Sequence, residues 1–133
     1  LMKTREYLED QIAMLLGGRA AEQILLNTMT AGASNDIERA VEIARKMVAE
    51  YGMSPLGPVH LGKPDDPHSQ TLLDRIERAT NDIVNAQMQR ACDIVSTRRA
   101  EIARLVADLM ERDTLDAEEI QECFAIQTVG VAA

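Results

Sequence analysis

The most constraining feature of this sequence is where its prolines fall. All four prolines and three of the seven glycines lie within residues 52–68. Proline breaks helices because it lacks an amide hydrogen and clashes with the preceding turn. The proline-free stretches on either side can therefore form long helices. We predict an N-terminal helical part (1–52), a linker (53–68), a C-terminal helical hairpin with a further short helix (69–126), and a flexible tail (127–133).

Composition favours helices over sheets. Aromatic residues make up only 2% of the chain, with no Trp and a single Phe, whereas hydrophobic residues make up 46% and charged residues 27%. A β-sandwich or barrel would require many β-branched and aromatic residues, and this chain is instead rich in helix formers. The sequence predicts an all-α fold of about five helices, with the Pro/Gly-rich linker in the middle.

The first helix is predicted to begin after Thr4, which can cap it, and to continue towards Leu25 on a helical spacing of apolar residues. Gly17 and Gly18 interrupt that spacing, and each costs about 1 kcal/mol against Ala in a helix interior. Two alternatives remain open: a loop between two short helices, or one helix that another backbone approaches closely. Arg19 follows among small and apolar residues, and we expect it to reach a carboxylate.

The second helix is predicted to begin near Ser34, where Asn35 and Glu38 have the spacing of a capping box. Gly52 is expected to end it. Its apolar stripe is predicted to consist of Ile37, Val41, Ala44, Val48 and Tyr51.

Beyond the linker, a long helix is predicted to begin at Ser69 or Thr71 and to break near residue 97. A second stripe of apolar residues predicts a partner helix over 101–112. Asp116 and Glu119 form another capping-box pair, which predicts a last short helix through Phe124.

Charge, cysteine and histidine content limit the possible partners. The net charge is −8 without a basic stripe, which excludes nonspecific binding to the nucleic-acid backbone. The two cysteines, Cys92 and Cys123, are expected to be small buried hydrophobes in a reducing compartment. His60 and His68 lie eight residues apart across the linker and are expected to be exposed.

The sequence also bears on the location of the chain. It has no apolar run of membrane-spanning length and no signal peptide, so we expect a soluble chain. Because Leu1 precedes Met2, we expect the chain to be a piece of a longer polypeptide.

One segment could carry chemistry, namely residues 30–40, where a glycine-containing loop leads into a helix with Asp36 in its first turn. An acidic residue there is favourable to the helix dipole, which is sufficient reason for its presence. The same placement would also present a carboxylate rigidly, as a metal ligand requires. A single carboxylate cannot hold a metal, so any further ligands must come from elsewhere.

An ordered set of motifs resembles the C-terminal part of the peptidase domain of FtsH-type ATP-dependent zinc metalloproteases. The resemblance extends over nearly the whole chain. It rests on Leu15-Leu16-Gly17-Gly18-Arg19-Ala20-Ala21-Glu22, Gly32-Ala33-Ser34-Asn35-Asp36-Ile37-Glu38-Arg39-Ala40, Ala44-Arg45-Lys46-Met47-Val48, Tyr51-Gly52-Met53-Ser54, Leu56-Gly57-Pro58-Val59 and Thr114-Leu115-Asp116.

The resemblance implies a zinc site to which this chain supplies one ligand, Asp36. In the family, two histidines of an HExxH helix complete the ligand set, and the Glu of that motif is the general base. That helix precedes the Gly-Gly-Arg run and is not in this sequence, so we expect no catalytic residue within the chain and no activity from it alone. Positioning or packing roles near the site are implied for Glu22, Gly17, Gly18, Arg19 and Asn35.

The resemblance further implies a homohexameric parent protein that degrades unfolded or membrane polypeptides at the cytoplasmic face of the inner membrane. ATP would act through an AAA+ domain, and membrane attachment through other segments, both outside this sequence. The alternative is a non-catalytic helical interaction module derived from the same family.

Overall fold

The computed structural model describes residues 2–60, 62–63 and 65–113, and within them every regular element is helical. The all-α prediction is confirmed, with four α-helices and one short 3₁₀ turn in place of about five helices. The last helix expected through Phe124, the tail 127–133 and Cys123 lie outside the described residues. The elements are α1 (Arg5–Leu25), η1 (Ala31–Ala33), α2 (Ser34–Ala49), α3 (Ser69–Thr97) and α4 (Arg99–Asp113).

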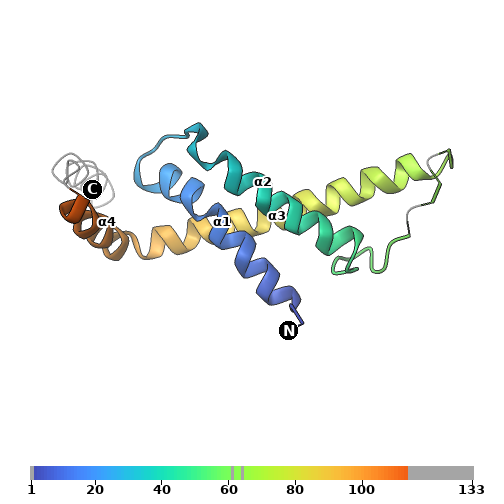
Figure 1. Cartoon of the computed structure of the whole chain (residues 1–133), viewed down its shortest axis with the longest axis horizontal. Coiled ribbons are helices and arrows are strands. Elements are labelled where there is room, and N and C mark those ends of the chain that lie inside the picture. The colour runs from blue at the N-terminus through green and yellow to red at the C-terminus, as the bar shows by residue number, and fades with distance from the viewer. Residues whose placement is uncertain (1, 61, 64, 114–133) are drawn as a thin grey trace.

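The longest helix, α3, organises the arrangement. It extends along the long axis of the molecule, and α1 and α2 cross it near its middle (Figure 1). Each of these three helices packs against the other two, whereas α4 follows α3 after a short break at Arg98. The core therefore runs through helices from both sides of the linker.

Most predicted helix ends are confirmed by backbone and side-chain contacts. The Thr4 hydroxyl oxygen accepts a bond from the Tyr7 amide at 3.1 Å and caps α1. Gly52 follows α2 with a positive φ of 63°, and the Met53 amide returns to the carbonyl oxygen of Met47 at 2.8 Å. This left-handed glycine closes the helix as expected, since a side chain there would be strained.

The start of α2 differs from the prediction. Ala33, not Asn35, occupies the N-cap position, and no side chain caps the helix there. Asn35 lies within the first turn, so the capping box with Glu38 is wrong. The reason is that η1 runs directly into α2: the Ser34 amide already donates to the carbonyl oxygen of Ala31.

Small residues allow α1 and α2 to approach closely. Ala40 and Ala44 on α2 are fully buried together with Met47, and they pack against Ile12 and Leu16 of α1. A second cluster joins α1 to α3 at its C-terminal half and is formed by Ala20, Leu25, Ala91 and Val95.

The predicted stripe of α2 is correct at its centre and wrong at its end. Ala44 and Val48 are buried, whereas Tyr51 is 53% exposed. Tyr51 lies beyond the last helical residue, so the helical spacing no longer points it at the core.

The glycine pair lies inside a single continuous helix. Helix α1 runs through Gly17 and Gly18 without a break. This rules out the alternative of a loop between two short helices. No backbone of the described residues approaches them: a methyl group built on either glycine meets no described atom within 4 Å. The chain as described therefore bears the cost of two helical glycines without a packing gain.

Replacing either glycine should stabilise this chain. Gly17→Ala and Gly18→Ala should each raise the free energy of unfolding by about 0.5–1 kcal/mol, because alanine restricts the unfolded chain and has room here. Urea unfolding followed by circular dichroism measures the change. Gly52→Ala is the opposing control and should destabilise, since the backbone of Pro58 would lie 3.2 Å from the new methyl group. Destabilisation by Gly17→Ala would show that another backbone packs there.

Candidate metal centre

Asp36 lies in the first turn of α2 at the edge of a hollow between α1 and α2. Its carboxylate is half-exposed, and its nearest charged partner is Arg39, with 3.8 Å between Nη1 and Oδ1. An exposed pair at that distance contributes little and leaves the carboxylate available. The hollow has a volume of about 530 Å³ and is lined by Tyr7, Asp10, Gln11, Met14, Leu15, Asp36, Arg39 and Ile43.

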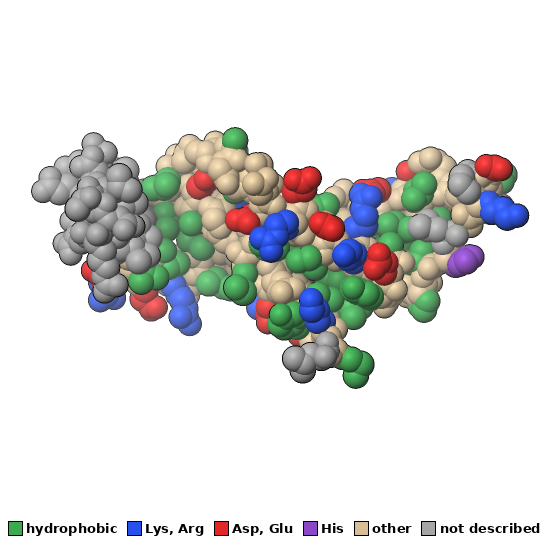
Figure 2. All heavy atoms as spheres, in the orientation of Figure 1, with side chains coloured by type: hydrophobic (Ala, Val, Ile, Leu, Met, Phe, Trp, Pro, Cys, Tyr) green, Lys and Arg blue, Asp and Glu red, His purple; other side chains and the backbone are tan. Residues whose placement is uncertain are grey.

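Apolar side chains are exposed beside the carboxylate. Met14 is 79% exposed and Tyr7 48% exposed, and both line the same hollow. Basic and acidic side chains are interspersed on the face seen in Figure 2, with hydrophobic side chains exposed among them. A large exposed Met next to a half-exposed carboxylate is a surface that a further segment or partner could cover.

The donor set fits one ligand position of a zinc site. A carboxylate oxygen is a suitable zinc ligand, and catalytic zinc sites use three protein ligands. Within the part of the chain that the structure describes, no three His, Cys, Asp or Glu side chains come together in a way that could hold a metal ion. Asp36 could therefore act as a ligand only alongside residues supplied from elsewhere.

Glu22 faces the loop that leads into α2. One carboxylate oxygen accepts from the Thr30 hydroxyl at 2.6 Å, and the other accepts from the Thr30 amide at 2.9 Å. These two bonds, with the hydroxyl contributing most, lower the pKa of Glu22 below its ordinary value of 4.5. The nearby guanidinium of Arg19 adds a smaller lowering.

Of the remaining candidate residues, Arg19 contacts this loop. The guanidinium of Arg19 donates to the carbonyl oxygen of Thr30 at 3.2 Å, so it reaches a carbonyl rather than the expected carboxylate. Asn35 is exposed in the first turn of α2, next to Asp36 in sequence. Gly17 and Gly18 directly precede Arg19 in α1. They line no part of the hollow beside Asp36.

Sequence reasoning missed Thr30, which joins Glu22 and Arg19 at one point. Its hydroxyl oxygen also accepts from the Gly32 amide at 3.2 Å, which is the cap of η1. The available signal was local: a Thr two residues before a Gly can form a side-chain turn of this kind. Residues 26–30, between the end of α1 and Thr30, have no helical or strand period, so the pairing of Glu22 with Thr30 cannot be read from the sequence.

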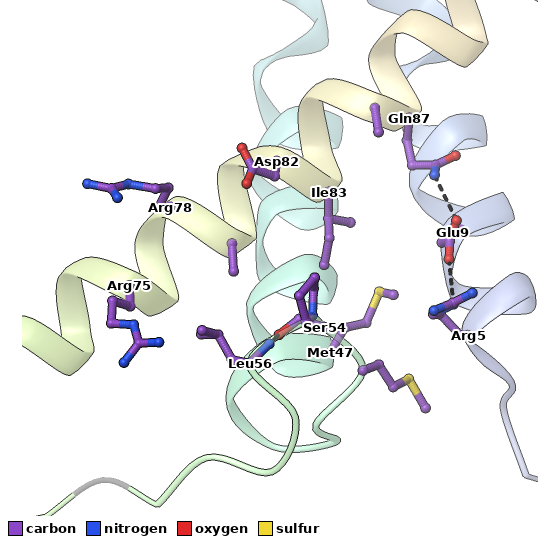
Figure 3. Close-up of a pocket in the computed structure, with 14 residues that line it drawn as sticks. Arg5, Glu9, Met47, Ser54, Leu56, Arg75, Arg78, Asp82, Ile83 and Gln87 are labelled. Carbon is purple, nitrogen blue, oxygen red and sulfur yellow. Dashed lines mark hydrogen bonds and ion pairs between the residues drawn. The ribbon is translucent and has the colours of Figure 1, made fainter.

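A separate hollow of about 430 Å³ lies where α1, α3 and the segment after α2 meet (Figure 3). Met47, Leu56 and Ile83 supply apolar lining. At its edge, the Gln87 amide donates to Glu9 at 3.0 Å, and Glu9 pairs with Arg5 at 3.1 Å. None of the candidate site residues lines this hollow, and the bond between Gln87 and Glu9 joins α3 to α1 at its edge.

The histidines are exposed as expected, whereas the described cysteine is only partly buried and not fully buried as predicted. His60 and His68 are exposed in the linker and at the start of α3. Cys92 is partly buried against the cluster between α1 and α3, and burial raises the pKa of its thiol. The neutral thiol therefore acts as a small hydrophobe.

Comparison with known proteins shows which protein family the chain belongs to. Residues 1–123 match Peptidase family M41, so the chain belongs to this family of peptidases. It is 56% identical over 124 residues to "ATP-dependent zinc metalloprotease FtsH 3" of Sorangium cellulosum, covering 93% of this chain and 21% of the relative.

Two further relatives carry the name "ATP-dependent zinc metalloprotease FtsH". That of Acidobacterium capsulatum is 39% identical over 130 residues, covering 89% of this chain and 20% of the relative. That of Thermus thermophilus is 38% identical over 128 residues, with the same coverage of both. The chain is therefore related to a zinc metalloprotease of the FtsH type and spans about a fifth of the length of these relatives. Among the described helices, none combines the length and apolar character of a membrane span.

The bonds from Thr30 should make the loop sensitive to acid. Because the pKa of Glu22 is lowered on folding, its contribution to stability is present above pH 4.5 and is lost as the pH falls through the lowered value. Carboxyl chemical shifts in an NMR titration measure this pKa directly. Thr30→Val removes the stronger bond and should raise the titration midpoint of Glu22. An unchanged midpoint in that variant would contradict the contact.

Proposed function

We propose that this chain forms part of the peptidase domain of a longer ATP-dependent zinc metalloprotease, in which Asp36 is the third protein ligand of the zinc. The observation that carries the proposal is the placement of Asp36. Its half-exposed carboxylate projects from the start of a helix held by buried residues and stands beside an open hollow. Membership of Peptidase family M41 and the names of the relatives support zinc as the metal.

The chain's own residues would provide an anionic ligand and a wall of the active site. The carboxylate of Asp36 would be the protein's anionic ligand to the zinc. Zinc held there supplies Lewis-acid catalysis for hydrolysis of a peptide bond. The apolar side chains of Met14 and Tyr7 beside Asp36 would be covered by the segment that brings the two histidine ligands, and covering them would exclude water from one side of the site.

We also propose the setting in which this domain works. The parent protein is a homohexamer on the cytoplasmic face of the inner membrane and degrades unfolded or membrane polypeptides. ATP is used by a separate ATPase domain, and the membrane is reached through other segments, while this portion is soluble and contributes surface to the ring. The names of the relatives support ATP dependence and proteolysis, and the chain spans about a fifth of their length, which leaves room for a separate ATPase domain in the rest. The chain alone is inactive, because a single ligand does not make a zinc site.

The test is the variant Asp36→Asn in a longer polypeptide that carries the family's HExxH segment ahead of this chain. Asn keeps the shape but removes the anionic oxygen, so we expect zinc affinity to fall by more than about 100-fold. Competition with a fluorescent chelator measures the affinity, and cleavage of a dye-labelled unfolded polypeptide should be lost in parallel.

Glu38→Gln is the matched control, because Glu38 is an exposed carboxylate two residues further along α2. It should leave both zinc affinity and cleavage unchanged. Normal zinc retention in Asp36→Asn would remove Asp36 from the ligand set. Failure of the parent polypeptide itself to bind zinc would favour the interaction module over the protease.

A further inference from the structure

The start of α2 lacks a capping side chain of its own. Ala33 stands at the N-cap, where Ser, Thr, Asp or Asn ordinarily satisfies the free amides of the first turn. Asp36 lies in this first turn, which is the part of a helix most prone to fray. Some other contact must therefore hold the turn that presents the carboxylate.

Thr30 is held through every polar group that it has. Its amide and its hydroxyl donate to the two oxygens of Glu22, and its carbonyl oxygen accepts from Arg19. Its hydroxyl oxygen also accepts from the Gly32 amide. Two of these bonds end on a carboxylate, and such charge-assisted bonds are shorter and stronger than neutral ones.

No free loop separates Thr30 from Asp36. The 3₁₀ turn η1 begins directly after Thr30, and α2 begins directly after η1. Within this stretch, Ala33 is buried and the Ser34 amide donates to the carbonyl oxygen of Ala31. A displacement of Thr30 would therefore be passed on to the first turn of α2.

Glu22 itself is tied to the end of α1. Its backbone carbonyl accepts from the amides of Leu26 and Thr28, and Asn27 between them adopts a positive φ of 49°. Asn is one of the few residues that tolerate this conformation. The backbone of Glu22 thus closes α1 while its side chain holds Thr30, so both ends of the irregular segment 26–30 are bonded to one residue.

We propose that Glu22 is a positioning residue that acts through Thr30 to fix the first turn of α2 and hence the carboxylate of Asp36. This inference rests on the proposed function, because it concerns the same metal ligand. Both oxygens of Glu22 are engaged by Thr30, and Glu22 does not line the hollow beside Asp36. Its role is therefore to orient the ligand-bearing turn and not to bind the metal.

The first test uses this chain as it is. Glu22→Ala should speed amide hydrogen exchange at Thr30 and Gly32 by roughly tenfold or more. The Thr30 amide loses its acceptor, and the Gly32 amide keeps an acceptor, the Thr30 hydroxyl, that Glu22 no longer holds in place. Thr30→Val should do the same at Gly32, and the double variant should add little, as expected of two residues in one network. Gln23→Ala is the matched control, since Gln23 is the exposed neighbour of Glu22 on α1 and should change neither amide.

The second test measures zinc affinity in the longer polypeptide that carries the HExxH segment. Glu22→Ala should weaken zinc binding by roughly 10–100-fold, the range seen when a group behind a metal ligand is removed. Glu22→Gln should restore part of the loss, because its amide oxygen can still accept one bond from Thr30. The melting temperature of the zinc-free protein, taken with each variant, separates this effect from a general loss of stability.

The outcomes separate the two proposals. Faster exchange at Thr30 with zinc affinity unchanged would overturn the positioning role, while Asp36 would stand as a ligand. Unchanged exchange in Glu22→Ala would overturn the contact itself. If Asp36→Asn binds zinc normally, the proposed function fails, and the positioning of a ligand by Glu22 fails with it.

Discussion

The structure depends on the close packing of α1 against α2 through small buried residues. Ala40 and Ala44 leave room for Ile12 and Leu16, and all four are almost wholly removed from solvent. Close-packed cores tolerate little change in volume, so the register between these two helices is strongly constrained. That register sets which side chains of α1 lie beside the first turn of α2, and so it determines the surroundings of Asp36.

Hydrogen bonds hold the segment that leads into α2, where the core between α1 and α2 makes few contacts. The core contacts begin near Ile37 and Ala40, after the turn that carries Asp36. The segment before that turn is held by Thr30, through Glu22 and Arg19 of α1, and by the burial of Ala33. Burial thus positions the body of α2, and hydrogen bonds together with the buried Ala33 position its start, as a rigid ligand site requires.

Helices and their ends were largely predictable from the sequence, because they depend on local signals. Thr4, Gly52 and Ser69 each act through groups a few residues away, and all three mark helix ends in the structure. Long-range contacts were not predictable in this way. The pairing of Glu22 with Thr30 joins a helix to an irregular loop, and the η1 turn that displaced the expected cap at Asn35 has no periodic pattern. The proposal for Asp36 came from its motif and not from periodicity.

A zinc-bound crystal structure of the longer polypeptide that contains the HExxH segment would test the ligand role of Asp36 most directly. We expect an Asp36 carboxylate oxygen about 2.0–2.2 Å from the zinc, with both oxygens of Glu22 still bonded to Thr30. A zinc ion coordinated by Glu22, with Asp36 remaining beside Arg39, would contradict it.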